Sequence, residues 1–145
     1  MKFFSRLARR EGECEPEPPA GDRLATYRST VRIKSQAMAG VTFEINRVSF
    51  GRRMELARQV REISQRAEFL QAGTELHERI EASLLKQEIE AIYLRWALVH
   101  VDGLTIDGEP ATAERLLEKG PEGLTREIVG AIKLQCGLGE DERKN

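Results

Sequence analysis

The chain has 145 residues, which is enough for one domain with a single hydrophobic core. Hydrophobic residues make up 40% of it and charged residues 32%, a balance that favours helices with solvated faces over a β-sandwich. The formal net charge of −1 gives no general attraction to a polyanion, and no apolar run approaches the roughly 18–20 residues that span a bilayer. Cys14 and Cys136 lie far apart in sequence, so we expect two free thiols in a reducing cytoplasm.

The first 22 residues differ in composition from the rest. A basic start is followed by EGECEPEPPAGD, which contains five acids, three prolines and two glycines. Such a segment buries too little apolar surface to offset the entropy lost on ordering. The sequence therefore predicts a disordered leader over 1–22, a folded domain over 23–139 and a charged tail over 140–145. The leader lacks the apolar region of about 7–15 residues that a secretory signal requires.

Residues 29–48 have the alternation of a β-hairpin. Apolar and polar residues alternate along two runs, and AMAG at 37–40 supplies a turn in which Gly40 is free to take a positive φ. A two-stranded hairpin is marginal by itself, so its apolar face is expected to pack against the helices. The residues on that face are Val31, Ile33, Phe43 and Ile45.

Two long helices are predicted next. The first begins at Ser49 or Phe50 and runs to about Ala72, where Gly73 ends it. The second begins near Thr74 and continues to about Val99. Both carry apolar residues at a spacing of three to four, and the short connection predicts an antiparallel helical hairpin.

The remaining segment predicts a turn-rich excursion and two helices. VDGLTIDGEPAT at 101–112 contains two Asp-Gly turn dipeptides, which indicate a tight β-excursion or structured loop. A short helix is expected over 113–119 and a last one over 121–135. The predicted fold class is therefore mainly α, an antiparallel helical hairpin plus C-terminal helices, with a small N-terminal β-hairpin.

Motifs for catalysis, cofactors and metals are not found in the sequence. HERIE at 77–81 lacks the second histidine of HExxH, and His77 lies too far from His100 to share a metal. No GxGxxG, GxxxxGK[ST] or GxSxG occurs, and Cys136 follows an apolar helix face as a small core residue would. We expect a protein that is not an enzyme and that holds no cofactor and no metal.

The charge pattern argues against nucleic-acid binding. Arginines outnumber acids between residues 47 and 68, but the second helix is rich in glutamates and no aromatic platform lies among the arginines. The apolar stripe of the second helix broadens toward its C-terminal end, where it exceeds what one neighbouring helix covers. We therefore expect a protein partner to bind there. The predicted partner-binding residues are Ile89, Ile92, Tyr93, Trp96 and Leu98.

The order of elements resembles the phage tail assembly chaperones, typified by the lambda-type G protein of long-tailed phages. The resemblance covers about residues 29–101 and rests on VTFEI, the link NRVS, the helix FGRRMELARQVREI and a long helix ending in YLRWALV. It implies a mostly helical protein in the host cytoplasm that binds the tape measure protein and keeps it soluble until tail tube subunits polymerise around it. No binding residue is carried over, because no strict family motif is matched.

The resemblance also implies a second product. In that family a −1 frameshift near the end of the gene makes a longer protein, and the final Lys144-Asn145 fits the common slippery sequence. The resemblance implies that this longer product binds the tail tube protein. The alternative is a bacterial helical adaptor or regulatory domain that binds another protein, and the sequence leaves a homo-oligomer open.

Overall fold

A three-stranded antiparallel sheet opens the fold of the computed structural model, which describes Gly21 and residues 24–137. The predicted leader and tail lie outside the described residues, except for Gly21. Strands β1 (Thr30–Lys34) and β2 (Thr42–Asn46) form the predicted hairpin, and Gly40 has the expected positive φ of 80°. The hairpin prediction is confirmed.

The third strand, β3 (Leu98–Asp102), begins within the segment predicted as the end of the second helix and ends in the predicted β-excursion. That helix ends at Ala97, and β3 pairs with the free edge of β2 through Leu98 and residues 100–102, giving the order β1-β2-β3. Val99 and Val101 alternate with His100, which suits a strand as well as it suits a helix end. The prediction of a helix to about Val99 is wrong. In the strand conformation these residues pair with backbone N–H and C=O groups of β2 that would otherwise lack partners.

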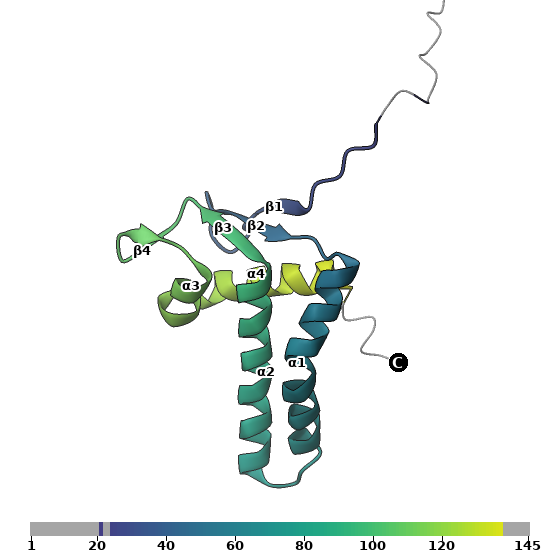
Figure 1. Ribbon diagram of the computed structural model, residues 1–145. Coiled ribbons are helices and arrows are strands. Elements are labelled where there is room, and N and C mark those ends of the chain that lie inside the picture. Colours follow the sequence, from purple (N-terminus) through teal and green to yellow (C-terminus); the bar gives the residue numbers. More distant parts are fainter. Residues whose placement is uncertain (1–20, 22–23, 138–145) are drawn as a thin grey trace, which may run out of the picture.

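Helices α1 (Phe50–Gln71) and α2 (Leu76–Ala97) form the predicted antiparallel hairpin, which extends away from the sheet (Figure 1). The Ser49 hydroxyl caps α1 by accepting a hydrogen bond of 3.3 Å from the backbone N–H of Arg52. A capping box formed by Glu75 and Glu78 begins α2.

The C-terminal part closes the core. The two-residue strands β4 (Thr105–Ile106) and β5 (Glu109–Pro110) flank a turn in which Asp107 and Gly108 both have positive φ. Helix α3 (Ala113–Lys119) follows, and α4 (Glu122–Gln135) crosses α2 and α1 near the sheet (Figure 1). The mainly α fold class with a small antiparallel hairpin is confirmed.

The core lies where the sheet, α4 and the C-terminal end of α2 meet. Its most deeply buried large side chains come from these three parts of the chain. Cys136 is buried with them as expected of a core residue, and this burial raises the pKa of its thiol. The six largest fully buried residues are Phe43, Ile45, Leu94, Leu124, Ile128 and Ile132.

One polar contact fastens the hairpin turn to α4. The Glu127 carboxylate accepts hydrogen bonds from the Ser35 hydroxyl and from the backbone N–H groups of Gln36 (2.7 Å) and Ala37 (3.3 Å). Burial raises the pKa of Glu127, but these three hydrogen bonds outweigh it and hold the pKa below its ordinary value. The contact therefore depends on the ionised carboxylate.

No helix in the described part of the chain is both long enough and apolar enough to cross a bilayer.

Candidate functional site

The N-terminal half of α2 exposes an apolar face. Leu76, Ile80 and Leu84 are spaced four residues apart, so they lie along one side of the helix. Their exposed fractions are 73%, 55% and 54%. By contrast, Ala82 and Leu85 are buried, and the neighbour of this half of α2 is α1. We call Leu76, Ile80 and Leu84 the free face of α2.

The free face leads into a hollow at the junction of α2, α3 and α4. Gln87 and Ala91, which continue the free face by helical spacing, line the hollow together with Leu117 of α3 and Val129 of α4. Its volume is about 180 Å³, enough for an aliphatic side chain to enter. From Leu76 to Ala91 the surface is about 22 Å long at 1.5 Å per residue. That length matches about four turns of a partner helix.

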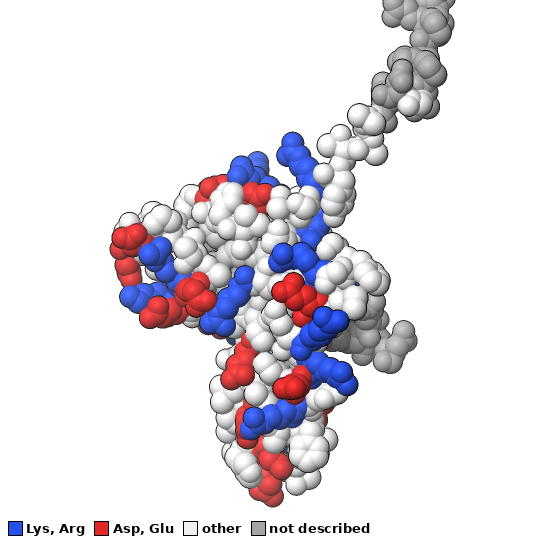
Figure 2. Space-filling model, in the orientation of Figure 1, with Lys and Arg blue, Asp and Glu red and all other residues white. Residues whose placement is uncertain are grey.

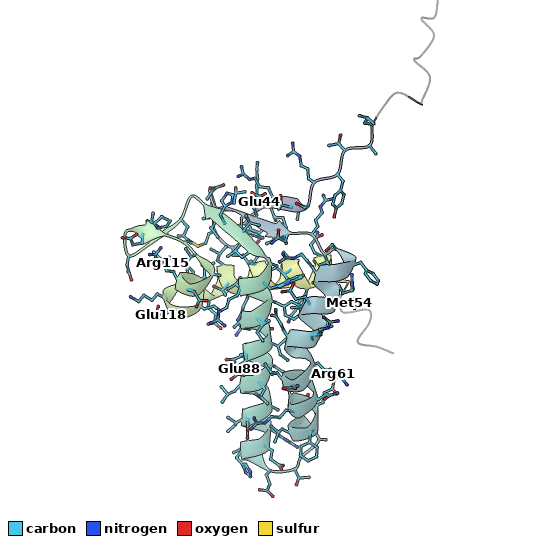
Figure 3. All side chains as sticks on the ribbon, viewed as in Figure 1. Glu44, Met54, Arg61, Glu88, Arg115 and Glu118 are labelled. Atoms are coloured by element: carbon cyan, nitrogen blue, oxygen red, sulfur yellow. The ribbon has the colours of Figure 1, made fainter. Side chains whose placement is uncertain are left out.

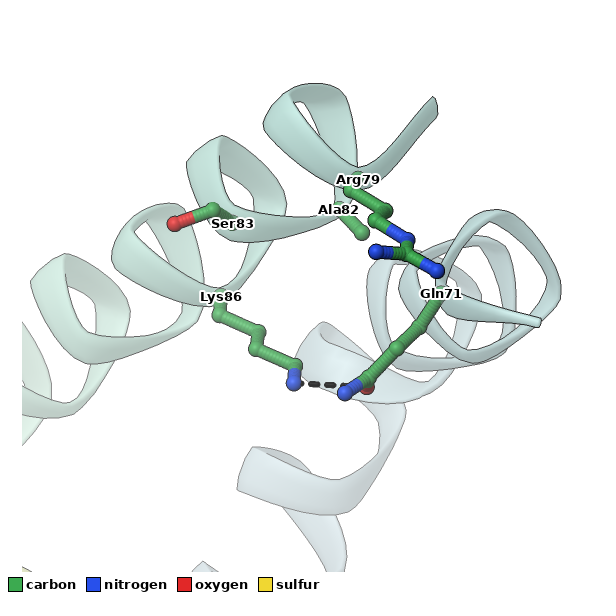
Figure 4. A pocket seen from close by; sticks show the side chains of 5 residues that line it. All are labelled: Gln71, Arg79, Ala82, Ser83 and Lys86. Atoms are coloured by element: carbon green, nitrogen blue, oxygen red, sulfur yellow. Dashed lines mark hydrogen bonds between the residues drawn. The ribbon is translucent and has the colours of Figure 1, made fainter. Parts of the chain in front are cut away.

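Charged residues border the free face differently on its two edges. Arg79 and Lys86 line a second hollow of about 420 Å³ together with Gln71, Ala82 and Ser83 (Figure 4). On the other edge, helical spacing places Glu81 and Glu88. Glu88 on α2 and Arg61 on α1 lie on opposite sides of the helical hairpin (Figure 3). The edge of Arg79 and Lys86 is therefore basic and the edge of Glu81 and Glu88 acidic.

The five residues predicted to bind a partner lie at the opposite end of α2 and in β3. Tyr93 is buried, and this burial raises the pKa of its hydroxyl, with a smaller contribution from Cys136. The other four are partly buried and pack against the core. The side chains that cover the broad end of the apolar stripe come from the sheet, α3 and α4. The four partly buried residues are Ile89, Ile92, Trp96 and Leu98.

Trp96 illustrates this role in the core. The guanidinium of Arg52 lies over its ring at 4.8 Å from the centroid and donates a hydrogen bond of 2.9 Å to its backbone carbonyl. This contact joins the beginning of α1 to the end of α2.

The free face could have been found from one sequence signal. Leu84 and Leu85 are adjacent, and adjacent helical residues point about 100° apart, so the two cannot both face α1. Leu85 is buried and Leu84 is half exposed. The apolar residues of α2 therefore lie on two sides of the helix and not in one stripe.

A polar network covers the outer side of the sheet. Arg32, Glu44, His100 and Asp102 come from the three strands, with Arg32 Nη2 at 3.0 Å and His100 Nε2 at 3.1 Å from the Asp102 carboxylate. These side chains are therefore engaged with one another. In the part of the chain that the structure describes, no group of three or more His, Cys, Asp or Glu side chains is arranged to hold a metal ion.

Acidic and basic side chains are interspersed over the face of the molecule shown in Figure 2, including α1 with its many arginines. Several of these arginines are engaged. Arg66 pairs with Glu81 at 2.6 Å, and Arg53 donates to the Cys136 carbonyl at 2.7 Å. This mixture of charge gives no continuous basic surface on that face.

Comparison with known proteins returned no match: no family model, no curated protein and no solved structure is similar to this chain.

Proposed function

We propose that this chain is a non-catalytic protein-binding protein that holds an apolar helix of its partner on the free face of α2. The observation that carries this proposal is the run of Leu76, Ile80 and Leu84, three large side chains more than half exposed on one side of one helix. Exposed apolar residues in a contiguous row mark interaction surfaces, and a groove beside a helix suits an amphipathic partner helix.

The particular function that we propose is that of a phage tail assembly chaperone acting in the host cell cytoplasm. The order of strand, arginine-marked helix and long helix resembles that family. The partner would then be the tape measure protein, whose long apolar helices must be bound to stay soluble. A charged fraction of 32% supports the solubility of such a complex. A longer frameshift product would extend the same chain toward the tail tube protein.

The alternative is a bacterial helical adaptor that uses the same face. The two proposals differ in the partner, so the neighbouring genes distinguish them. A tape measure gene directly downstream supports the chaperone, whereas a regulatory or signalling operon supports the adaptor.

The experiment is co-expression with the tape measure protein of the same genome. We expect that protein to be soluble only when the chain is present, and to co-purify with more than one copy of it. If the tape measure protein is equally soluble alone, the chaperone proposal fails.

A pair of variants tests the surface. Ile80→Glu combined with Leu84→Glu places two charges on the free face, and we expect the partner to be lost while the melting temperature stays unchanged. Met54→Glu combined with Phe69→Glu is the matched control, because it places the same charge on exposed apolar residues of α1. Retention of the partner by both double variants would show that the free face is not the binding surface.

A further inference from the structure

The hollow beside the free face is lined by two cationic side chains and by no carboxylate. Arg79 and Lys86 line it, and Lys86 Nζ donates a hydrogen bond of 2.6 Å to the Gln71 side chain oxygen (Figure 4). Among the described residues, neither cation forms an ion pair. On the opposite edge, Glu81 is already paired with Arg66 at 2.6 Å, whereas Glu88 forms no ion pair among the described residues. The basic edge therefore has charge available for a partner.

A second copy of this chain does not fit the free face. A two-fold pair with antiparallel α2 helices would place Arg79 and Lys86 of one copy against the same residues of the other, and like charges repel. A parallel pair would bring acidic and basic edges together, but α3 stands beside the same side of α2 near its C-terminal end. The two α3 helices would then lie at the same end of the paired free faces.

We propose that the hollow of Arg79 and Lys86 receives carboxylates from an edge of the partner helix, so that the partner is an amphipathic helix with an acidic border. This inference rests on the proposed function of the free face and adds the chemistry of the partner. Arg79 and Lys86 are seven residues apart, which is about 10.5 Å along the helix axis. Two acidic residues seven apart on one edge of the partner helix match that spacing. The apolar stripe of the partner helix then lies against the free face.

The test uses designed helical peptides of about 18 residues, long enough to cover the surface from Leu76 to Ala91. Each peptide has the same leucine stripe, and two edge positions seven residues apart carry Glu, Gln or Lys. Binding to the full chain is measured by fluorescence anisotropy. We expect the Glu peptide to bind about three- to tenfold more tightly than the Gln peptide, and the Lys peptide to bind most weakly. The preference should shrink in salt on the order of 0.5 M, because screening weakens exposed charge pairs.

Two double variants locate the effect. Arg79→Gln with Lys86→Gln should remove the preference for Glu while leaving the binding of the Gln peptide unchanged. Arg58→Gln with Arg61→Gln removes the same charge from exposed positions of α1 and should preserve the preference. A preference that survives in the first variant, or disappears equally in both, would overturn the assignment of this hollow.

The remaining outcomes separate this inference from the proposed function. Equal binding of the Glu and Gln peptides, abolished by Ile80→Glu, would overturn the acidic border and retain the free face as a docking surface. Peptide binding that is unchanged by Ile80→Glu, or no binding of any peptide, would overturn both the acidic border and the free face as a docking surface. A dimer in sedimentation velocity that Ile80→Glu dissociates would assign the face to a second copy and overturn the partner proposed here.

Discussion

Both halves of α2 carry large apolar side chains, but their surroundings differ. The C-terminal half, Gln87–Ala97, is joined to α3 by Arg95 and Glu114 and to α4 by the ion pair of Glu90 with Lys133 at 2.7 Å. The side-chain pairs of the N-terminal half, Leu76–Lys86, are with α1: Arg66 with Glu81, and Gln71 with Lys86. In the N-terminal half, apolar side chains that face α1, such as Ala82 and Leu85, are buried, and those on the opposite side are exposed.

A long helix can therefore both stabilise a small protein and present a surface. Burial in the C-terminal half supplies the free energy of folding, because that half meets the sheet and two further helices. The N-terminal half adds one helix-to-helix contact and keeps its opposite side open. A surface of this kind can be altered with little effect on folding.

The largest effect is expected for Phe43→Ala. Phe43 is fully buried on β2, which pairs with β3 and contacts α4, and removal of its ring should lower the free energy of unfolding by about 3–5 kcal/mol. Urea unfolding followed by circular dichroism measures this loss. An unchanged midpoint would show that the sheet does not contribute to the core.

Leu94→Ala and Leu84→Ala compare the two halves of α2 with the same substitution. Leu94 has no exposed surface, so its truncation should cost about 2–5 kcal/mol. Leu84 is half exposed, and its truncation should change the free energy of unfolding by less than about 0.5 kcal/mol. Similar costs for both variants would contradict the division of α2 into a core half and an open half.

Glu127→Gln tests the fastening of the hairpin turn to α4. The loss of charge-assisted hydrogen bonds should cost about 1–3 kcal/mol at neutral pH. Because the folded pKa of Glu127 lies below the unfolded value, its contribution is fully present above the unfolded pKa and is lost as the pH falls through the folded pKa. Melts across the acidic range should therefore show the wild type and the variant converging at low pH.

Glu78→Ala should give a small effect that is confined to the beginning of α2. Glu78 completes the capping box at the beginning of α2, far from the core. Its truncation should lower global stability by about 0.5 kcal/mol, yet accelerate amide hydrogen exchange in the first turns of α2. Faster exchange in the C-terminal half as well would mean that the two halves open together.

The sequence predicted the elements that rest on local signals. The alternation at 31–45 and the Asp107-Gly108 turn are short-range patterns, and the structure has them. The strand Leu98–Asp102 was not predicted, because its apolar spacing continues the helix pattern and its partner β2 lies more than 50 residues away. Long-range pairing of this kind carries no local signal.

The candidate site shows the same limit. A broad apolar stripe indicates that more than one neighbour is present, but periodicity does not reveal whether that neighbour is in the same chain. Around Trp96 the neighbours are in the same chain, namely α1 and the sheet. Around Ile80 the described chain supplies none on the open side. Only the three-dimensional arrangement of the elements separates these two cases.

Trp96 is the only tryptophan of the chain, and it lies beneath the Arg52 guanidinium at the junction of α1 and α2. Its fluorescence emission will therefore follow the polarity of that junction, and it will shift to longer wavelength when the core opens to water. The open end of α2, several turns away, contributes nothing to the signal. The protein thus carries an intrinsic optical reporter of its own unfolding that stays silent while the distant face is occupied.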